Sequence, residues 1–168
     1  MNSDVNSALM DLDQQIQALA AESPDDGVTG AAITAIAPTL KTLATQLKHL
    51  QYYVLQTLNQ DWVMLTISNR QQANTAKNVV YAFPSLQDVA KGPYSVKDPQ
   101  VMAIPVPVIH ILFKMLAMKP VDSIIFFENP GNTKQGIEVR RDDLQTLVQK
   151  QLQQTQGTPA SNPPPDIA

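Results

Sequence analysis

The amino-acid sequence predicts an α+β fold, a mixed five-stranded sheet with helices packed on it, preceded by two N-terminal amphipathic helices. Apolar residues recur every three or four positions through residues 5–58, which is the period of an α-helix. From residue 62 onward, short runs of β-branched and aromatic residues alternate with helical patterns and turn residues. The chain has 168 residues and is 43% hydrophobic, which favours one folded domain over residues 1–154.

A helical N-terminal part is predicted for residues 1–59. Its first apolar stripe covers residues 5–19 and ends before a segment of helix breakers, 23–27. The second stripe covers residues 40–58, and Pro38 is expected to open this helix because an N–H at the first helical position has no partner. Either both stripes cover the sheet, or one of them docks a partner protein.

Five segments are predicted to be strands, and one of them has a distinctive pattern. Residues 123–127 (SIIFF) are apolar on both faces, so we expect this strand at the centre of the sheet, covered on both sides. The predicted strands are 62–68, 79–83, 101–104, 123–127 and 137–140.

Helices are predicted between and after these strands. Ser85 and Asp88 have the spacing of a capping box at the start of a short helix. A second helix is predicted over residues 107–118, and a third begins at Asp142. Residues 155–168 hold four prolines and no apolar period, so we expect a disordered Pro-rich tail there.

Composition and charge exclude several classes of function. The formal net charge is −3 and the Lys and Arg residues are scattered, so the basic stripe of a nucleic-acid-binding protein is absent. The longest apolar stretch, 101–118, is interrupted by prolines and a lysine and is unsuited to a membrane span. The acidic beginning of the chain does not resemble a secretory leader. We therefore expect a cytoplasmic protein with neither nucleic acid nor membrane as partner.

Catalytic and metal-binding signatures are sparse. The chain has no cysteine, and neither His49 nor His110 has a second ligand three or four residues away, so no metal or other cofactor is expected. Glu128 and Glu138 flank the turn segment 129–135 and can approach each other across a hairpin. The alternatives to a binding function are therefore a small hydrolase that uses these two carboxylates, or a small-molecule sensor.

Apolar surface is the more promising feature, and it points to a non-catalytic adaptor or assembly chaperone. Aromatic residues at the ends of predicted elements are good interface anchors, and both faces of the strand 123–127 need cover. A groove between a helix and the sheet, or an unpaired strand edge, would accept a segment of another protein. The predicted partner-binding residues are Tyr52, Tyr53, Tyr94, Phe126 and Phe127.

The order of elements and several phrases between residues 62 and 152 resemble the SseB-like domain family. The phrases are 80–88 (VYAFPSLQD), 105–107 (PVP) opening a helix, 121–131 (VDSIIFFENPG) and 136–139 (GIEV) before a closing helix. The resemblance covers about half of the chain, and the helical residues 1–59 have no counterpart in it. It implies an α+β fold and no catalytic residues.

The whole chain, with its Gln-rich helices and Pro-rich end, also resembles carboxysome shell assembly chaperones of the CcmS type in size and character. This resemblance implies a protein that assists carboxysome shell assembly by capturing a segment of a shell protein.

Overall fold

The computed structural model describes residues 2–23, 29–69, 72–91, 100–132 and 135–160, and it confirms the predicted α+β class. The described helices are α1 (Asn2–Glu22), α2 (Thr29–Thr45), α3 (Leu86–Lys91), α4 (Val108–Ala117) and α5 (Arg141–Ala160). The described strands are β1 (Gln51–Thr57), β2 (Leu65–Asn69), β3 (Gln72–Ala82), β4 (Val101–Pro107), β5 (Ser123–Phe127) and β6 (Gly136–Arg140). The two predicted N-terminal helices are both present, and they pack against each other.

The strands form two sheets, whereas the sequence predicted one sheet of five strands. Four strands make a mixed sheet in the order β2-β3-β5-β6, with β3 parallel to β5 and the two outer pairs antiparallel. The strands β1 and β4 form a separate antiparallel pair. Among the described residues, one isolated bridge links the two sheets: Tyr53 of β1 and Phe83, the residue after β3, exchange two backbone hydrogen bonds of 2.7 and 2.8 Å.

The strand β5 lies at the centre of the larger sheet, and this prediction is confirmed. On one face, Ile124 and Phe126 are fully buried in the main core beneath the helices. On the other face, Ile125 and Phe127 join a smaller cluster with Phe83. A strand that is apolar on both faces is stable only with cover on both sides, and the structure provides it.

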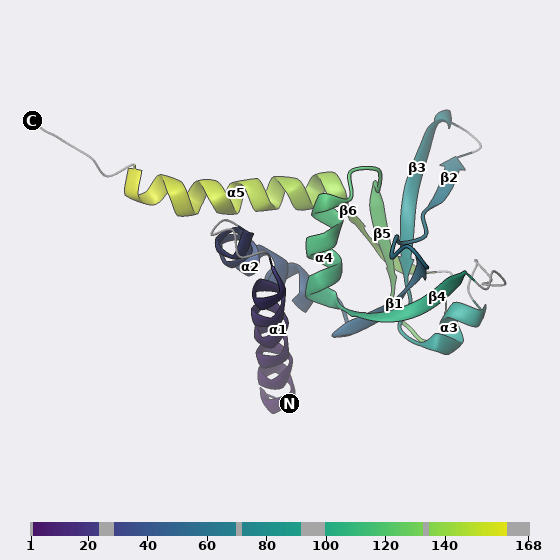
Figure 1. Cartoon of the computed structure of the whole chain (residues 1–168), viewed down its shortest axis with the longest axis horizontal. Coiled ribbons are helices and arrows are strands. Elements are labelled where there is room, and N and C mark those ends of the chain that lie inside the picture. The colour runs from purple at the N-terminus through teal and green to yellow at the C-terminus, as the bar shows by residue number, and fades with distance from the viewer. Residues whose placement is uncertain (1, 24–28, 70–71, 92–99, 133–134, 161–168) are drawn as a thin grey trace, which may run out of the picture.

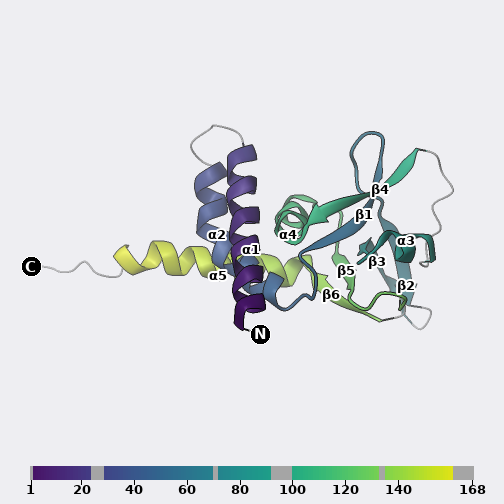
Figure 2. The same ribbon diagram turned by 90° about the horizontal axis from the view of Figure 1, so that it is seen from below.

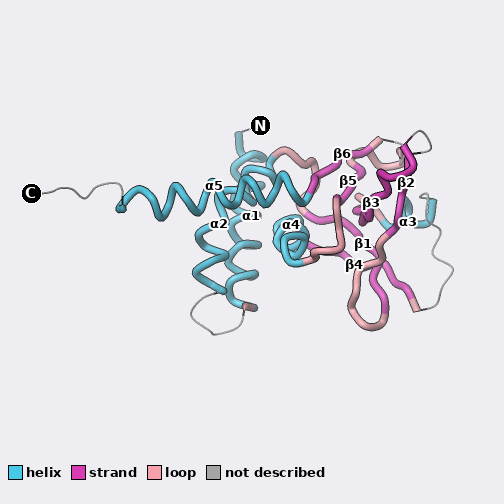
Figure 3. Tube along the Cα trace, turned by 90° about the horizontal axis from the view of Figure 1, so that it is seen from above, coloured by secondary structure: helices cyan, strands magenta, loops and turns pink. Residues whose placement is uncertain are grey.

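The helix α4 lies between the strands and the other long helices. In Figures 1 and 2, α1, α2 and α5 lie on one side of α4, and all the strands lie on the other. The same order is visible from the opposite side in Figure 3, where α5 extends well beyond the rest of the molecule. The helix α4 is therefore in contact with both parts, and five of its residues are fully buried.

Residues 51–57 form the strand β1, so the prediction that a helix covers 40–58 is wrong in its second half. Tyr52 and Val54 face the main core, while Tyr53 and Leu55 face the smaller cluster. Because both faces of β1 are apolar, its sequence lacks the alternation of apolar and polar residues that indicates a strand. Leu50, Val54 and Leu58 are four residues apart, which is the spacing of an apolar stripe on a helix.

Pro38 lies inside α2, so the prediction that it opens the second helix is also wrong. The helix starts at Thr29, and Ile33 and Ile36 precede the proline on the same buried face as Leu40 and Ala44. Burial of this continuous apolar face outweighs the cost of an interior proline, about 3 kcal/mol.

Several boundaries also differ from the prediction. The strand β2 starts at Leu65, because Trp62 makes an isolated bridge with Gln56 instead of continuing a strand. The helix α5 reaches Ala160, so the first part of the predicted tail 155–168 is helical. The rest of that tail lies outside the described residues.

Gly136 in β6 provides a test of this packing. A Cβ atom at this position would lie 2.7 Å from a methyl carbon of Ile125 and 3.0 Å from the backbone oxygen of Phe126. We expect Gly136→Ala to lower the free energy of unfolding by about 1–3 kcal/mol, measured by urea denaturation. The matched control is Gly30→Ala in α2, where the nearest atom is 3.6 Å away and the helix favours alanine. An unchanged urea midpoint for Gly136→Ala would contradict the described packing of β6 on β5.

Candidate functional site

The helix α1 is fastened to α4 by the side chain of Gln15. Pro107 precedes α4 and provides no side-chain cap, so the first N–H groups of that helix need partners from elsewhere. The Gln15 amide oxygen accepts a hydrogen bond of 3.0 Å from the N–H of Ile109, and its amide nitrogen donates one of 2.9 Å to the Leu50 carbonyl. The backbone oxygen of Gln15 accepts a further bond of 3.2 Å from the His110 ring. Gln15 thus caps a helix to which it does not belong.

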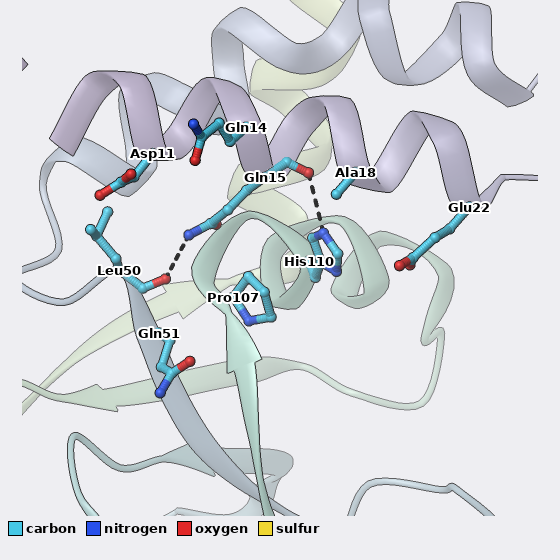
Figure 4. A pocket seen from close by; sticks show the side chains of 9 residues that line it. All are labelled: Asp11, Gln14, Gln15, Ala18, Glu22, Leu50, Gln51, Pro107 and His110. Atoms are coloured by element: carbon cyan, nitrogen blue, oxygen red, sulfur yellow. Dashed lines mark hydrogen bonds between the residues drawn. The ribbon is translucent and has the colours of Figure 1, made fainter. Parts of the chain in front are cut away.

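An open groove of about 550 Å³, called here the polar groove, runs beside this junction (Figure 4). The α1 residues on its wall are three or four positions apart, so they lie on one stripe of the helix. Carboxylates mark its two ends, Asp11 at one and Glu22 at the other, and His110 lies between them. Its lining is Asp11, Gln14, Gln15, Ala18, Glu22, Leu50, Gln51, Pro107 and His110.

A second hollow of about 400 Å³, called here the apolar pocket, adjoins the polar groove at His110, which lines both. One wall is a face of the β1–β4 pair, where Gln56, Ile104 and Val106 lie, and α4 provides another wall. Its lining is Leu19, Gln56, Trp62, Ile104, Val106, His110, Phe113, Lys114 and Ala117.

The side of the apolar pocket formed by Trp62 carries a cation. The Lys114 ammonium nitrogen lies 4.5 Å from the centre of the Trp62 ring, at cation–π distance. Trp62 is the single tryptophan of the chain and only 6% of its surface is exposed. Met102 lies further along β4 on the same face as Ile104 and is 51% exposed. The pocket therefore offers apolar walls to a side chain that enters from solvent.

The edge of β4 that faces away from β1 pairs with none of the described strands, and it is less suited to recognition than the polar groove and the apolar pocket. The N–H of Val108 donates to Leu50, so the register directs the even-numbered N–H groups of β4 toward β1. Pro105 and Pro107 occupy odd positions, which face outward, and they have no N–H to donate. This half of the edge cannot pair fully with an added strand. The sequence predicted that a partner binds either in a groove beside a helix or at an unpaired strand edge, and the geometry favours the groove.

The partner-binding residues predicted from the sequence line neither the polar groove nor the apolar pocket. Tyr52, Phe126 and Phe127 are buried in the two cores and have no surface to offer. Tyr53 is half-buried and faces the smaller cluster, and Tyr94 lies outside the described residues. The buried side chains of Tyr52, Phe126 and Phe127 therefore stabilise the fold. The candidate site is instead formed by the polar groove and the apolar pocket.

Tyr52 belongs to a buried polar cluster with Glu128 and His49. Its hydroxyl donates to one carboxylate oxygen of Glu128, and the N–H of Lys48 donates to the other at 2.5 Å. The His49 ring donates to the Glu128 carbonyl at 2.7 Å. Burial of Tyr52, reinforced by its hydrogen bond to Glu128, raises the pKa of its hydroxyl far above the ordinary value. This cluster ties the α2–β1 connection to the end of β5.

The two carboxylates proposed for a hydrolase do not meet. Glu128 faces Tyr52 on the side of the main core, whereas Glu138 is paired with Ile125 on the opposite face of the sheet. Glu138 accepts hydrogen bonds from Lys77 and Ser123. Both lower the pKa of its carboxyl group, and the bond from Lys77 has the larger effect. The predicted acid–base pair is therefore not formed, and each carboxylate has a structural partner.

The described residues contain no group of three or more His, Asp or Glu side chains placed to bind a metal ion. None of the helices in the described part of the chain combines the length and the apolar character that crossing a membrane requires. No protein-family model matches the chain, and no curated protein sequence matches it.

Proposed function

We propose that the chain is a non-catalytic adaptor or assembly chaperone that holds a segment of another protein in the polar groove and the apolar pocket. The observation that carries this proposal is their junction at His110, where a polar wall of α1 and an apolar wall of α4 and β4 adjoin. Such a surface suits a peptide, which presents backbone polar groups and apolar side chains together.

The length of the polar groove supports a chain segment as the occupant. Asp11 and Glu22 are separated by three turns of α1, which corresponds to about 16 Å at 1.5 Å per residue. Both hollows are open to solvent, whereas a typical small-molecule site encloses most of its ligand. Following the resemblance to carboxysome shell assembly chaperones, we extend the proposal to a segment of a shell protein.

Selection from a displayed library of random dodecapeptides on the full chain tests this function. We expect peptides that bind and that change the fluorescence emission of Trp62, because this single tryptophan lines the apolar pocket. Absence of any enriched peptide, or binding that leaves Trp62 emission unchanged, would contradict the proposal that the groove captures a protein segment.

A further inference from the structure

The polar groove carries negative charge at both ends. Asp11 and Glu22 project from α1 toward the groove, with the amide side chain of Gln14 and the small Ala18 between them (Figure 4). Neither carboxylate forms an ion pair with any residue that the structure describes. The two ion pairs among the described residues are Lys41–Asp13 and Lys77–Glu138. Within the described part of the chain, these two acids therefore face the groove without a compensating cation.

The other charged and titratable groups that the structure describes around the polar groove do not neutralise its two carboxylates. The Lys114 ammonium lies over the Trp62 ring at the apolar pocket. The His110 ring is held by the backbone oxygen of Gln15. The rest of the lining consists of Leu50, Gln51 at the start of β1 and Pro107 at the end of β4, and none of these residues is charged.

We propose that the segment bound here is basic, with one Lys or Arg on each side of an apolar residue. This inference rests on the proposed function and names the chemistry of its partner. The apolar residue enters the apolar pocket beside His110, and the two cations face Asp11 and Glu22. An extended chain advances about 3.3 Å per residue, so basic residues about five positions apart reach both carboxylates.

Charge complementarity also favours a basic segment of another protein over residues 161–168 of this chain as the occupant of the polar groove. Residues 161–168 contain no Lys or Arg and include Asp166, so they do not supply the cations that the groove lacks. The chain as a whole has a net charge of −3, which favours encounter with a basic partner over association with a second copy.

The sequences of the selected dodecapeptides test the inference directly. We expect enrichment of peptides that contain two basic residues four to six positions apart with an apolar residue between them. Enriched peptides that change Trp62 emission but lack this basic pair would overturn the inference and leave the proposed function standing. If no peptide is enriched at all, it is the proposed function that fails.

Charge variants provide the second arm of the test. For a selected basic peptide, we expect the double variant Asp11→Asn, Glu22→Gln to bind about ten-fold more weakly at low salt. Raising the salt to about 0.5 M should remove most of this difference, because the screening length falls to about 4 Å. The matched control is Asp13→Asn, on the same helix but engaged with Lys41, and its affinity should stay unchanged. Equal affinity of the double variant and the native chain at low salt would overturn the inference.

Discussion

Tyr52→Phe is expected to lower the free energy of unfolding by about 1–3 kcal/mol, the cost of depriving a buried charged acceptor of a donor. The carboxylate concerned is that of Glu128, which is 6% exposed and accepts from the Tyr52 hydroxyl. The ring itself is retained, so its edge-on contacts with Phe126 and His49 remain. Urea denaturation at neutral pH measures the effect.

Two comparisons distinguish this hydrogen bond from general damage to the core. Tyr53→Phe is the matched control, because that residue is adjacent but half-buried, and we expect less than about 0.5 kcal/mol. The variants Tyr52→Phe and Glu128→Gln should also not be additive, with a coupling above about 0.5 kcal/mol, because they remove parts of one hydrogen bond. Additive effects would show that the described pair does not stabilise the protein.

The pH dependence follows from the raised pKa of Tyr52. Unfolding returns this hydroxyl to its ordinary pKa near 10, so the unfolded chain releases a proton above that pH while the folded chain keeps it. The stabilisation is therefore fully present below about pH 10 and decreases as the pH rises further. Between pH 10 and 11, the native protein should lose stability more steeply than Tyr52→Phe.

Although β5 is buried on both faces, it could be predicted because its short β-branched and aromatic run is bounded by turn residues, and α4 could be predicted because its apolar residues keep a helical period. The strand β1 could not, because Tyr52 and Val54 are buried on one face while Tyr53 and Leu55 are covered on the other. Two-sided burial removes the alternation by which strands are distinguished from helices. The position of β1 outside the larger sheet is decided by long-range pairing with β4 and has no local signal.

The candidate site was missed for a related reason. Its walls come from α1, α4 and β4, which are distant in sequence, and no motif joins them. One local signal was available: Gln15 is a polar residue beside the apolar stripe that contains Leu12, Ile16 and Leu19. A polar side chain in such a position is favoured when it satisfies a backbone group, here that of Ile109.

Blocking the apolar pocket by Ala117→Phe should have the largest effect on binding. Ala117 is exposed at the end of α4 and lines the pocket, so an aromatic ring there occupies space otherwise open to the partner. We expect the affinity for peptides selected on the native chain to fall at least ten-fold, since a single buried apolar side chain contributes about 1.5–3 kcal/mol. Titration of the labelled peptide, followed by its fluorescence anisotropy, measures the loss.

The control for this variant is Ala32→Phe, which places the same ring on the exposed side of α2, away from the groove. Both variants should unfold within about 0.5 kcal/mol of the native chain, because neither changes a core residue. The loss caused by Ala117→Phe should persist at high salt, because it removes apolar contact, whereas the loss caused by neutralising Asp11 and Glu22 should disappear. If Ala117→Phe binds the selected peptides as tightly as Ala32→Phe, the partner does not use the apolar pocket.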